Sequence, residues 1–229
     1  MNLLYSLIYM VITFCLTILV YKYFKKEGLY IWICISIITT NIESVKIIDI
    51  LGLTTALGNI TYSNIFLATD ILNENEGEKS AKKSVLYGFL AMITFTGLIC
   101  FSLLFIPNEL DTSHASLVNI FSVVPRIAIA SVIAYLVSQL VDVYIFQKLK
   151  KKYNKLWLSK NGSTIIGQLV DTIIFVSLAY FGTMPFNEFL ILVATTYIFK
   201  FILAMSDTGF IYIARKIKQN QNRANLAKQ

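Results

Sequence analysis

The sequence predicts an all-α polytopic membrane protein, a helical bundle with six core transmembrane helices and an additional N-terminal helix. Hydrophobic residues make up 56% of the 229 residues and charged residues 14%, with a mean hydropathy of +0.67. Soluble domains carry about 25% charged and 45–50% apolar residues. One small core cannot enclose this much apolar surface, so lipid must cover the rest. We expect a single transmembrane domain over residues 1–217 and a polar cytoplasmic tail over residues 218–229.

Apolar segments separated by short loops support this fold class. A helix needs about 20 apolar residues to span a bilayer. Seven segments are candidates, at about residues 3–20, 29–51, 58–72, 84–106, 117–146, 163–181 and 188–214. If the first lies at the periphery, a core of six helices remains.

Basic residues alternate between loops, which predicts the orientation. The formal net charge is +7, and the loops after the first, third, fifth and seventh segments carry the lysines and arginines. These are Lys22, Lys25 and Lys26; Lys79, Lys82 and Lys83; Lys148, Lys150, Lys151, Lys152, Lys155 and Lys160; and Arg215, Lys216, Lys218, Arg223 and Lys228. The positive-inside rule then places the N-terminus outside and the C-terminus in the cytoplasm, in the cytoplasmic membrane. Because the basic stretches flank membrane segments, a nucleic-acid partner is not expected.

Ionisable residues inside the apolar segments are the most informative feature. Each costs about 2.5–3.5 kcal/mol at the bilayer centre. Carboxylates outnumber cations there: Glu43, Asp49, Asp70, Asp142, Asp171 and Asp207 stand against Lys46, Arg126 and Lys200. Some carboxylates must therefore be protonated, solvated or paired with a ligand. A protonatable carboxylate, a cationic ligand or a ligand rich in N–H donors would fit, and protons are a reasonable coupling ion.

Spacing suggests how some of these residues meet. Glu43, Lys46 and Asp49 would share one face of the second helix, where Glu43 and Lys46 can pair; an interhelical salt bridge is the alternative. Asp70 would line a cavity, or would be a solvated residue at a helix end.

The fifth and sixth helices repeat the pattern Gln-Leu-Val-Asp-x-x-Ile-Phe, at residues 139–146 and 168–175. Coincidence in a chain rich in Ile, Leu and Val is the alternative. Gln and Asp at i and i+3 share a face, and antiparallel neighbours could bring Asp142 and Asp171 to comparable depth.

No catalytic constellation competes with these residues. The single histidine, His114, lies in an outer loop, and the sequence has no HExxH, GxSxG or Walker motif. We therefore expect no enzyme, no metal site and no cofactor. Without an ATPase motif the chain cannot power transport through ATP by itself.

Several short pieces in order resemble the queuosine precursor transporter family, also described as vitamin uptake transporters. They lie between about Asn41 and Tyr212: Asn41; Phe-Leu-Ala-Thr-Asp at 66–70, followed by Gly77; residues 126–131; Ala134, Tyr135, Gln139 and Asp142; Trp157; residues 163–164; residues 171–172; and residues 199–200. The resemblance implies an inner-membrane importer with about six helices. Its implied substrates are 7-deazaguanine compounds used for tRNA modification, namely 7-cyano-7-deazaguanine, 7-aminomethyl-7-deazaguanine, queuine or queuosine.

A guanine-like base presents an N1–H and an exocyclic amine side by side, and one carboxylate can accept both. We expect Asp171 or Asp70 to read this edge. Gln139, Gln168 and Asn41 would orient the base, while Arg126 and Lys200 would balance Asp142 and Asp171. The candidate substrate-binding residues are thus Asn41, Asp70, Arg126, Gln139, Asp142, Gln168, Asp171 and Lys200. The alternative is a substrate-binding membrane subunit that needs a separate ATPase module. The sequence is also compatible with a homo-oligomer.

Overall fold

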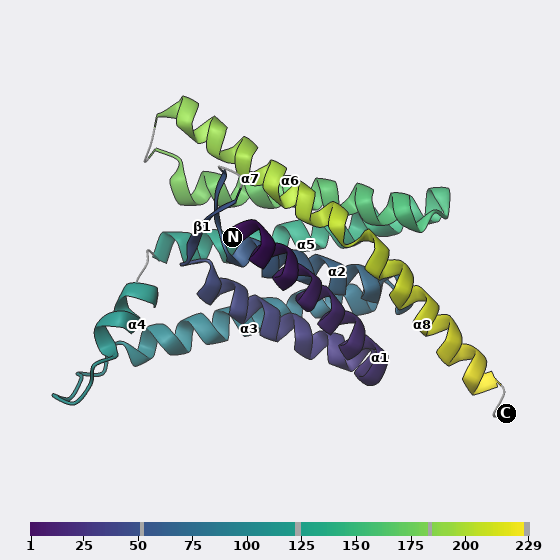
Figure 1. The fold of residues 1–229 in the computed structure, drawn as a ribbon, viewed down its shortest axis with the longest axis horizontal. Helices are drawn as coiled ribbons and strands as arrows, with labels where there is room; N and C mark the ends of the chain where they lie inside the picture. Colours follow the sequence, from purple (N-terminus) through teal and green to yellow (C-terminus); the bar gives the residue numbers. More distant parts are fainter. Residues whose placement is uncertain (51–52, 122–124, 183–184, 227–229) are drawn as a thin grey trace.

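Long helices dominate the computed structural model, which describes residues 1–50, 53–121, 125–182 and 185–226 (Figure 1). In chain order the elements are α1 (Asn2–Glu43), β1 (Ile47–Ile50), β2 (Leu53–Ala56), α2 (Gly58–Asn75), α3 (Glu78–Ser102), α4 (His114–Phe121), α5 (Pro125–Tyr153), α6 (Leu156–Tyr180), α7 (Phe186–Ser206) and α8 (Thr208–Leu226). Five described stretches are long and apolar enough to cross a membrane: α1, α3, α5 from Ile129, α6 and the run of α7 into α8. The predicted all-α membrane bundle is confirmed, whereas the count of six plus one is not.

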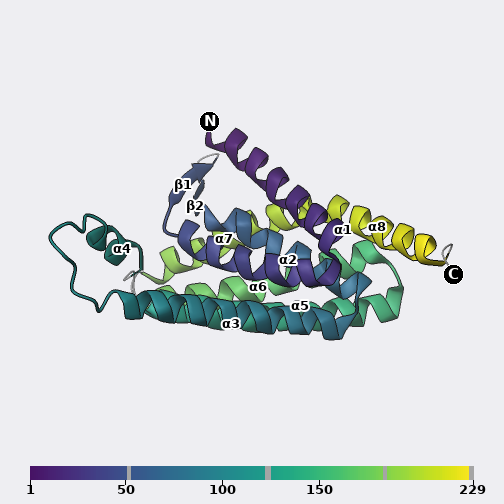
Figure 2. The ribbon, with the colours of Figure 1, turned by 90° about the horizontal axis from the view of Figure 1, so that it is seen from below.

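Helix α1 is kinked and folds back on itself (Figure 2). Lys25 has a non-helical backbone, with φ 54° and ψ −142°, and divides α1 into two halves. Trp32 in the second half donates to the Thr17 hydroxyl in the first at 2.9 Å. The kink thus accounts for the first two predicted segments.

The second predicted segment ends earlier than expected. Helix α1 stops at Glu43, and the antiparallel hairpin β1–β2 follows, with Ile47 opposite Ala56. The shared helical face of Glu43, Lys46 and Asp49 is therefore wrong. Glu43 instead accepts hydrogen bonds from the hydroxyls of Tyr9 and Thr61. Strands form here because residues 47–50 and 53–56 are rich in Ile and Thr, whose branched Cβ favours extended backbone.

Helix α2 occupies the centre of the bundle. Nearly all its side chains are buried, because α2 packs mainly against α1 and is also contacted by α3, α5, α7 and α8. A helix enclosed by protein can carry the serine, threonine, asparagine and aspartate residues that a lipid-facing helix excludes. Gly77, with φ 87°, then supplies the left-handed turn that leads into α3.

Two predicted helices are divided. The segment at 117–146 forms α4 and α5, and the segment at 188–214 forms α7 and α8, which run end to end with a break at Asp207 (Figure 1). Helix α8 continues to Leu226, through the expected tail, and Lys218 forms an ion pair with Glu76 at 2.6 Å. The sixth helix begins at Leu156, earlier than expected, and so includes Lys160.

The two ends of the bundle differ in charge. The kink of α1, the α2–α3 turn, the α5–α6 connection and the C-terminal end of α8 lie at one end in both views (Figures 1 and 2). These segments carry the basic residues predicted for the cytoplasmic side. The strands β1 and β2, the α3–α4 loop, the end of α6 and the start of α7 lie toward the opposite end (Figure 1). The fold therefore gathers separate basic loops at one end, as the positive-inside pattern requires.

Candidate functional site

The polar interior of the bundle lies where α2 packs against the antiparallel pair α5 and α6. Ser138 on α5 donates to Asp171 on α6 at 3.2 Å, and Asp142 on α5 lies against Gly167 on α6. Since Ser138 and Asp142 are one turn apart, Asp142 and Asp171 are offset by about 6 Å along the bundle. The expectation that Asp142 and Asp171 lie at comparable depth in the membrane is therefore not met.

Asp171 is fully engaged by protein groups. Its carboxylate forms an ion pair with Lys200 at 2.5 Å and accepts the Tyr62 hydroxyl at 2.7 Å, in addition to Ser138. The Lys200 ammonium also lies 5.1 Å from the centre of the Tyr62 ring. Lys200 and Asp171 are therefore paired, and α2, α5, α6 and α7 meet around them.

Asp70 and Asp142 have few partners, although both are completely buried. Asp70 Oδ2 accepts the Thr164 hydroxyl at 3.2 Å, and Asp142 lies near the carboxyl group of Asp70 and the Ser163 hydroxyl. Asp70 Oδ1 and both oxygens of Asp142 have no hydrogen-bond partner among the described residues. A buried acceptor without a donor costs about 1–3 kcal/mol, and more when it is charged. These oxygens are therefore available to a ligand.

Gly167 allows the helices to approach closely at this point. A Cβ on this residue would lie 3.1 Å from Asp142 Cβ and 3.1 Å from a ring carbon of Phe66. Both distances are shorter than ordinary carbon–carbon contacts. The glycine thus brings the carboxylate of α5 against α6 and α2.

Gln139 and Gln168 bring further unpaired groups to the same helices. Both amide atoms of Gln139 and the amide oxygen of Gln168 lack a hydrogen-bond partner within the part of the chain that the structure describes, and both side chains are buried. Each glutamine lies three residues before an aspartate, on the same helix face. We call Asp70, Gln139, Asp142 and Gln168 the central polar cluster.

Lys160 is an interior residue, although its position beside a run of lysines predicts a cytoplasmic loop. It is completely buried, forms an ion pair with Asp207 and donates to the carbonyl oxygen of Ala204 at 2.5 Å. The neighbouring Asn161 accepts the Thr208 hydroxyl at 2.9 Å. Helix α6 therefore supplies partners to the backbone and side chains where α7 breaks and α8 begins. The sequence holds a signal for this: Asp171, Gln168, Thr164 and Lys160 recur every three or four residues, as expected for one face of a helix that extends back to Lys160.

Asn41 is a predicted site residue that the structure does not bring into the central polar cluster. The amide of Asn41 donates to the carbonyl oxygen of Ile37 within its own helix at 2.9 Å, and the side chain is half-buried. Arg126 is in the first turn of α5, and its side chain lies outside the described residues.

Ion pairs close the basic end of the bundle. Glu74 at the end of α2 pairs with Lys150 of α5 at 2.8 Å and with Arg215 of α8 at 3.5 Å. Glu76 accepts from Lys218 and, at 3.2 Å, from the Tyr21 hydroxyl. These contacts join α1, α2, α5 and α8 below the central polar cluster.

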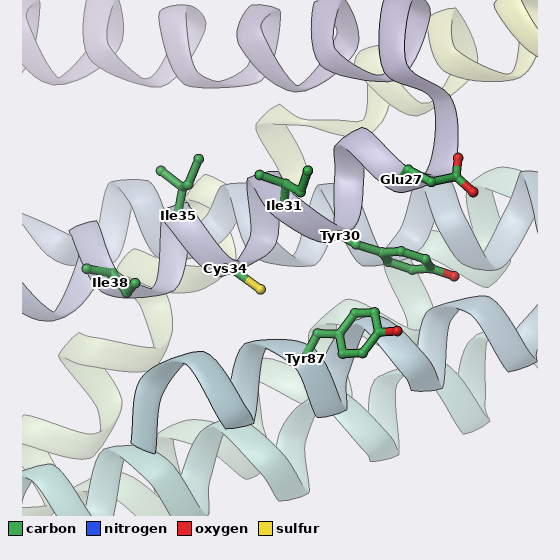
Figure 3. Close-up of a pocket in the computed structure, with 7 residues that line it drawn as sticks. All are labelled: Glu27, Tyr30, Ile31, Cys34, Ile35, Ile38 and Tyr87. Atoms are coloured by element: carbon green, nitrogen blue, oxygen red, sulfur yellow. The ribbon is translucent and has the colours of Figure 1, made fainter. Parts of the chain in front are cut away.

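A metal site or a pocket elsewhere in the described structure would be an alternative place for a ligand. Across the described ranges, no group of three or more His, Cys, Asp or Glu side chains could hold a metal ion. A groove of about 420 Å³ lies between the second half of α1 and α3, lined by Glu27, Tyr30, Ile31, Cys34, Ile35, Ile38 and Tyr87 (Figure 3). Its almost wholly apolar lining suits lipid chains better than a polar solute.

Comparisons with known proteins identify the family to which this chain belongs. The family described as "Putative vitamin uptake transporter" matches residues 56–214, which include the central polar cluster, Lys160 and Lys200. The chain is 37% identical over 218 residues to the "Probable queuosine precursor transporter" of Bacillus subtilis (strain 168), with 94% of this chain and 95% of that protein covered. It is 29% identical over 133 residues to the "Queuosine precursor transporter" of Escherichia coli (strain K12), with 58% of each covered. No solved structure matches the chain significantly. The resemblance found in the sequence is thus confirmed, and the chain belongs to the vitamin uptake transporter family that includes these queuosine precursor transporters.

Proposed function

We propose that this chain imports queuosine precursors of the 7-deazaguanine class across the cytoplasmic membrane, for use in tRNA modification. The names of the curated relatives support the substrate class. Within the chain, the observation that carries the proposal is a fully buried carboxylate, Asp142, with both oxygens free of partners among the described residues, one helical turn from the unpaired amide of Gln139.

The donor edge of a guanine-like base matches Asp142. Its N1–H and exocyclic amine can donate to the two oxygens of one carboxylate, and an amide can complete the O6 or N7 side. The sequence predicts that Asp171 or Asp70 reads this edge, and we assign it to Asp142 instead. Lys200, Tyr62 and Ser138 already occupy Asp171, and the Thr164 hydroxyl donates to one oxygen of Asp70. Gln139 and Gln168 then orient the base, and Asp171 with Lys200 positions the helices.

Buried hydrogen-bonding groups also give a reason for selectivity. A site that hydrogen-bonds a polar substrate rejects an analogue lacking those groups by a large factor, because its own groups would stay unpaired. Adenine carries an unprotonated N1 and an acceptor pattern unlike that of guanine, so Asp142 as a carboxylate would face an acceptor. We therefore expect 7-deazaguanines to be selected over adenine-type bases.

Charge at the two ends supports the orientation within this proposal. The basic end faces the cytoplasm, with the C-terminus there and the hairpin toward the outside. Substrate then enters from the end opposite the ion pairs of Glu74 and Glu76.

The test is uptake in cells that can neither make nor import these precursors. Labelled queuine, 7-cyano-7-deazaguanine and 7-aminomethyl-7-deazaguanine are supplied, and queuosine in tRNA is measured. We expect the chain to restore queuosine, and Asp142→Asn to lower uptake at least tenfold. Asp111→Asn, in an exposed loop, is the matched control.

Failure to restore queuosine with any precursor, with the protein shown to be in the membrane, would contradict the proposal. Full activity of Asp142→Asn would contradict the assigned contact. Transport by the purified chain in liposomes then separates a self-sufficient importer from the alternative, a binding subunit that needs a separate ATPase module.

A further inference from the structure

The charges around the central polar cluster do not balance. Asp70, Asp142 and Asp207 face one lysine, Lys160, and all four side chains are completely buried. Asp171 of α6 and Lys200 of α7 form an ion pair with each other, and Tyr62 of α2 donates to Asp171. At the basic end, Glu74 of α2 is paired with Lys150 of α5 and Arg215 of α8. Two negative charges therefore lack a cation among the described residues. Uncompensated charges are not stable in a protein interior, so an additional cation is required when the carboxylates are ionised.

Lys160 cannot supply that cation alone. Its ammonium is held by Asp207 and by the carbonyl oxygen of Ala204 at the α7–α8 break. The contact with Asp207 already offsets one of the three carboxylates, which leaves Asp70 and Asp142. Thr164 contacts Asp70, and Gly167, one turn further along α6, lies against Asp142, so the two carboxylates lie against neighbouring positions of α6. Only one of their four oxygens has a hydrogen-bond partner within the described chain, the Thr164 hydroxyl at 3.2 Å from Asp70 Oδ2.

Oxygen groups suited to a small cation meet at this position. The two carboxylates with the hydroxyls of Thr164 and Ser163 form a set that can take a proton between the carboxylates, or a sodium ion coordinated by oxygen. A proton and a sodium ion are both small monovalent cations, and either could be bound between two adjacent carboxylates. Asp142 is the carboxylate that the substrate would occupy, and it accepts two N–H groups only when it is ionised.

We propose that Asp70 binds the coupling cation, a proton or a sodium ion, while Asp142 binds the substrate; this inference rests on the proposed function. The cation enters from the outer side and binds a carboxylate oxygen of Asp70, while substrate binds Asp142 as the anion. Both are released to the cytoplasm. If the cation is a proton, an O–H bond forms on Asp70 and breaks again to water at the inner side. No bond in the substrate changes.

The experiment separates exchange from accumulation in liposomes that contain the purified full chain. Exchange of labelled for unlabelled queuine, with no ion gradient, requires that the protein bind substrate and open its binding site to each side of the membrane in turn. Accumulation of labelled queuine is driven by an inward proton gradient in one arm, and by an inward sodium gradient at equal pH in the other. We expect the wild type to accumulate queuine with one gradient. Asp70→Asn should lower the ratio of accumulation to exchange at least tenfold.

Asp70→Glu and Asp111→Asn serve as comparisons. Asp70→Glu keeps a carboxylate and should recover part of the accumulation, whereas Asp111→Asn should match the wild type. The arm that supports accumulation identifies the cation as proton or sodium. This inference would be overturned if Asp70→Asn kept the wild-type ratio of accumulation to exchange. It would also be overturned if folded Asp70→Asn lost exchange to the same extent as accumulation. A wild type that exchanges none of the precursors would instead contradict the proposed function.

Discussion

Lys160 and Asp207 form an ion pair in which neither side chain is exposed to solvent, and this pair joins α6 to the break between α7 and α8. An interrupted helix leaves carbonyl groups without intrahelical donors. At membrane depth such groups must find partners within the protein. Lys160 meets this need because it donates to the Ala204 carbonyl while it neutralises Asp207.

Removing Lys160 should therefore destabilise the protein. Lys160→Met leaves the Asp207 charge buried and unpaired, which should lower the free energy of unfolding by about 3–5 kcal/mol. Lys160→Met with Asp207→Leu should recover much of this loss, because an apolar pair of similar volume replaces the ion pair. Thermal unfolding in detergent measures both. Lys82→Met, which removes an exposed pair with Glu78, is the control and should cost about 0–1 kcal/mol. Equal stability of Lys160→Met and this control would refute the structural role.

Gln139 should matter to transport more than to stability. Both its amide atoms are buried without partners in the described structure, so Gln139→Leu should leave the unfolding temperature unchanged or higher. Uptake of queuosine precursors should fall at least tenfold, because an amide that contacts the base is lost. Uptake per folded molecule and thermal unfolding are measured together.

Gln147 offers a contrast on the same helix. Its amide donates to the backbone oxygen of Asn73 at 3.1 Å. Gln147→Leu should lower the free energy of unfolding by about 1–2 kcal/mol, with uptake per folded molecule retained. If Gln147→Leu impaired uptake as strongly as Gln139→Leu, the assignment of Gln139 to the substrate would fail.

Gly167 should resist even the smallest side chain. Gly167→Ala places a methyl group 3.1 Å from Asp142 Cβ and from a Phe66 ring carbon, so α5, α6 and α2 must move apart. Overpacking of this kind costs about 1–3 kcal/mol, and the displaced Asp142 should also lower uptake. Gly97→Ala is the matched control, because a Cβ there would meet no atom within 4 Å. Comparable stability and uptake in the two variants would show that this close approach is unnecessary.

The orientation can be tested with reporter fusions. The positive-inside pattern places the C-terminus in the cytoplasm and the α3–α4 loop outside. A fluorescent protein that folds only in the cytoplasm should therefore be bright after residue 229. Alkaline phosphatase, active only outside, should be active when inserted near residue 110. The reverse result at both positions would invert the direction of transport proposed above.

The sequence alone was enough to predict the membrane bundle, because apolar runs and basic loops are read from composition and order. It also identified the buried carboxylates Asp70, Asp142, Asp171 and Asp207, although not Lys160, since a charge inside an apolar segment is costly wherever it finally points. The division of α1 at Lys25 fits the two predicted segments. The hairpin at residues 47–56 was missed because an apolar run rich in β-branched residues reads as helix or strand, and a regular spacing of charges favoured the helix.

What the sequence determined is the inventory of intramembrane carboxylates, amides and cations and the family to which the chain belongs. Only the tertiary structure decided their pairing. It joined Asp171 to Lys200 and turned Lys160 inward to Asp207, although the position of Lys160 beside a run of lysines predicts a solvated loop. It left Asp142 and Gln139 without partners in the described interior. Pairing depends on which helix faces meet and at what depth, and residues far apart in the chain meet there only after the helices have packed.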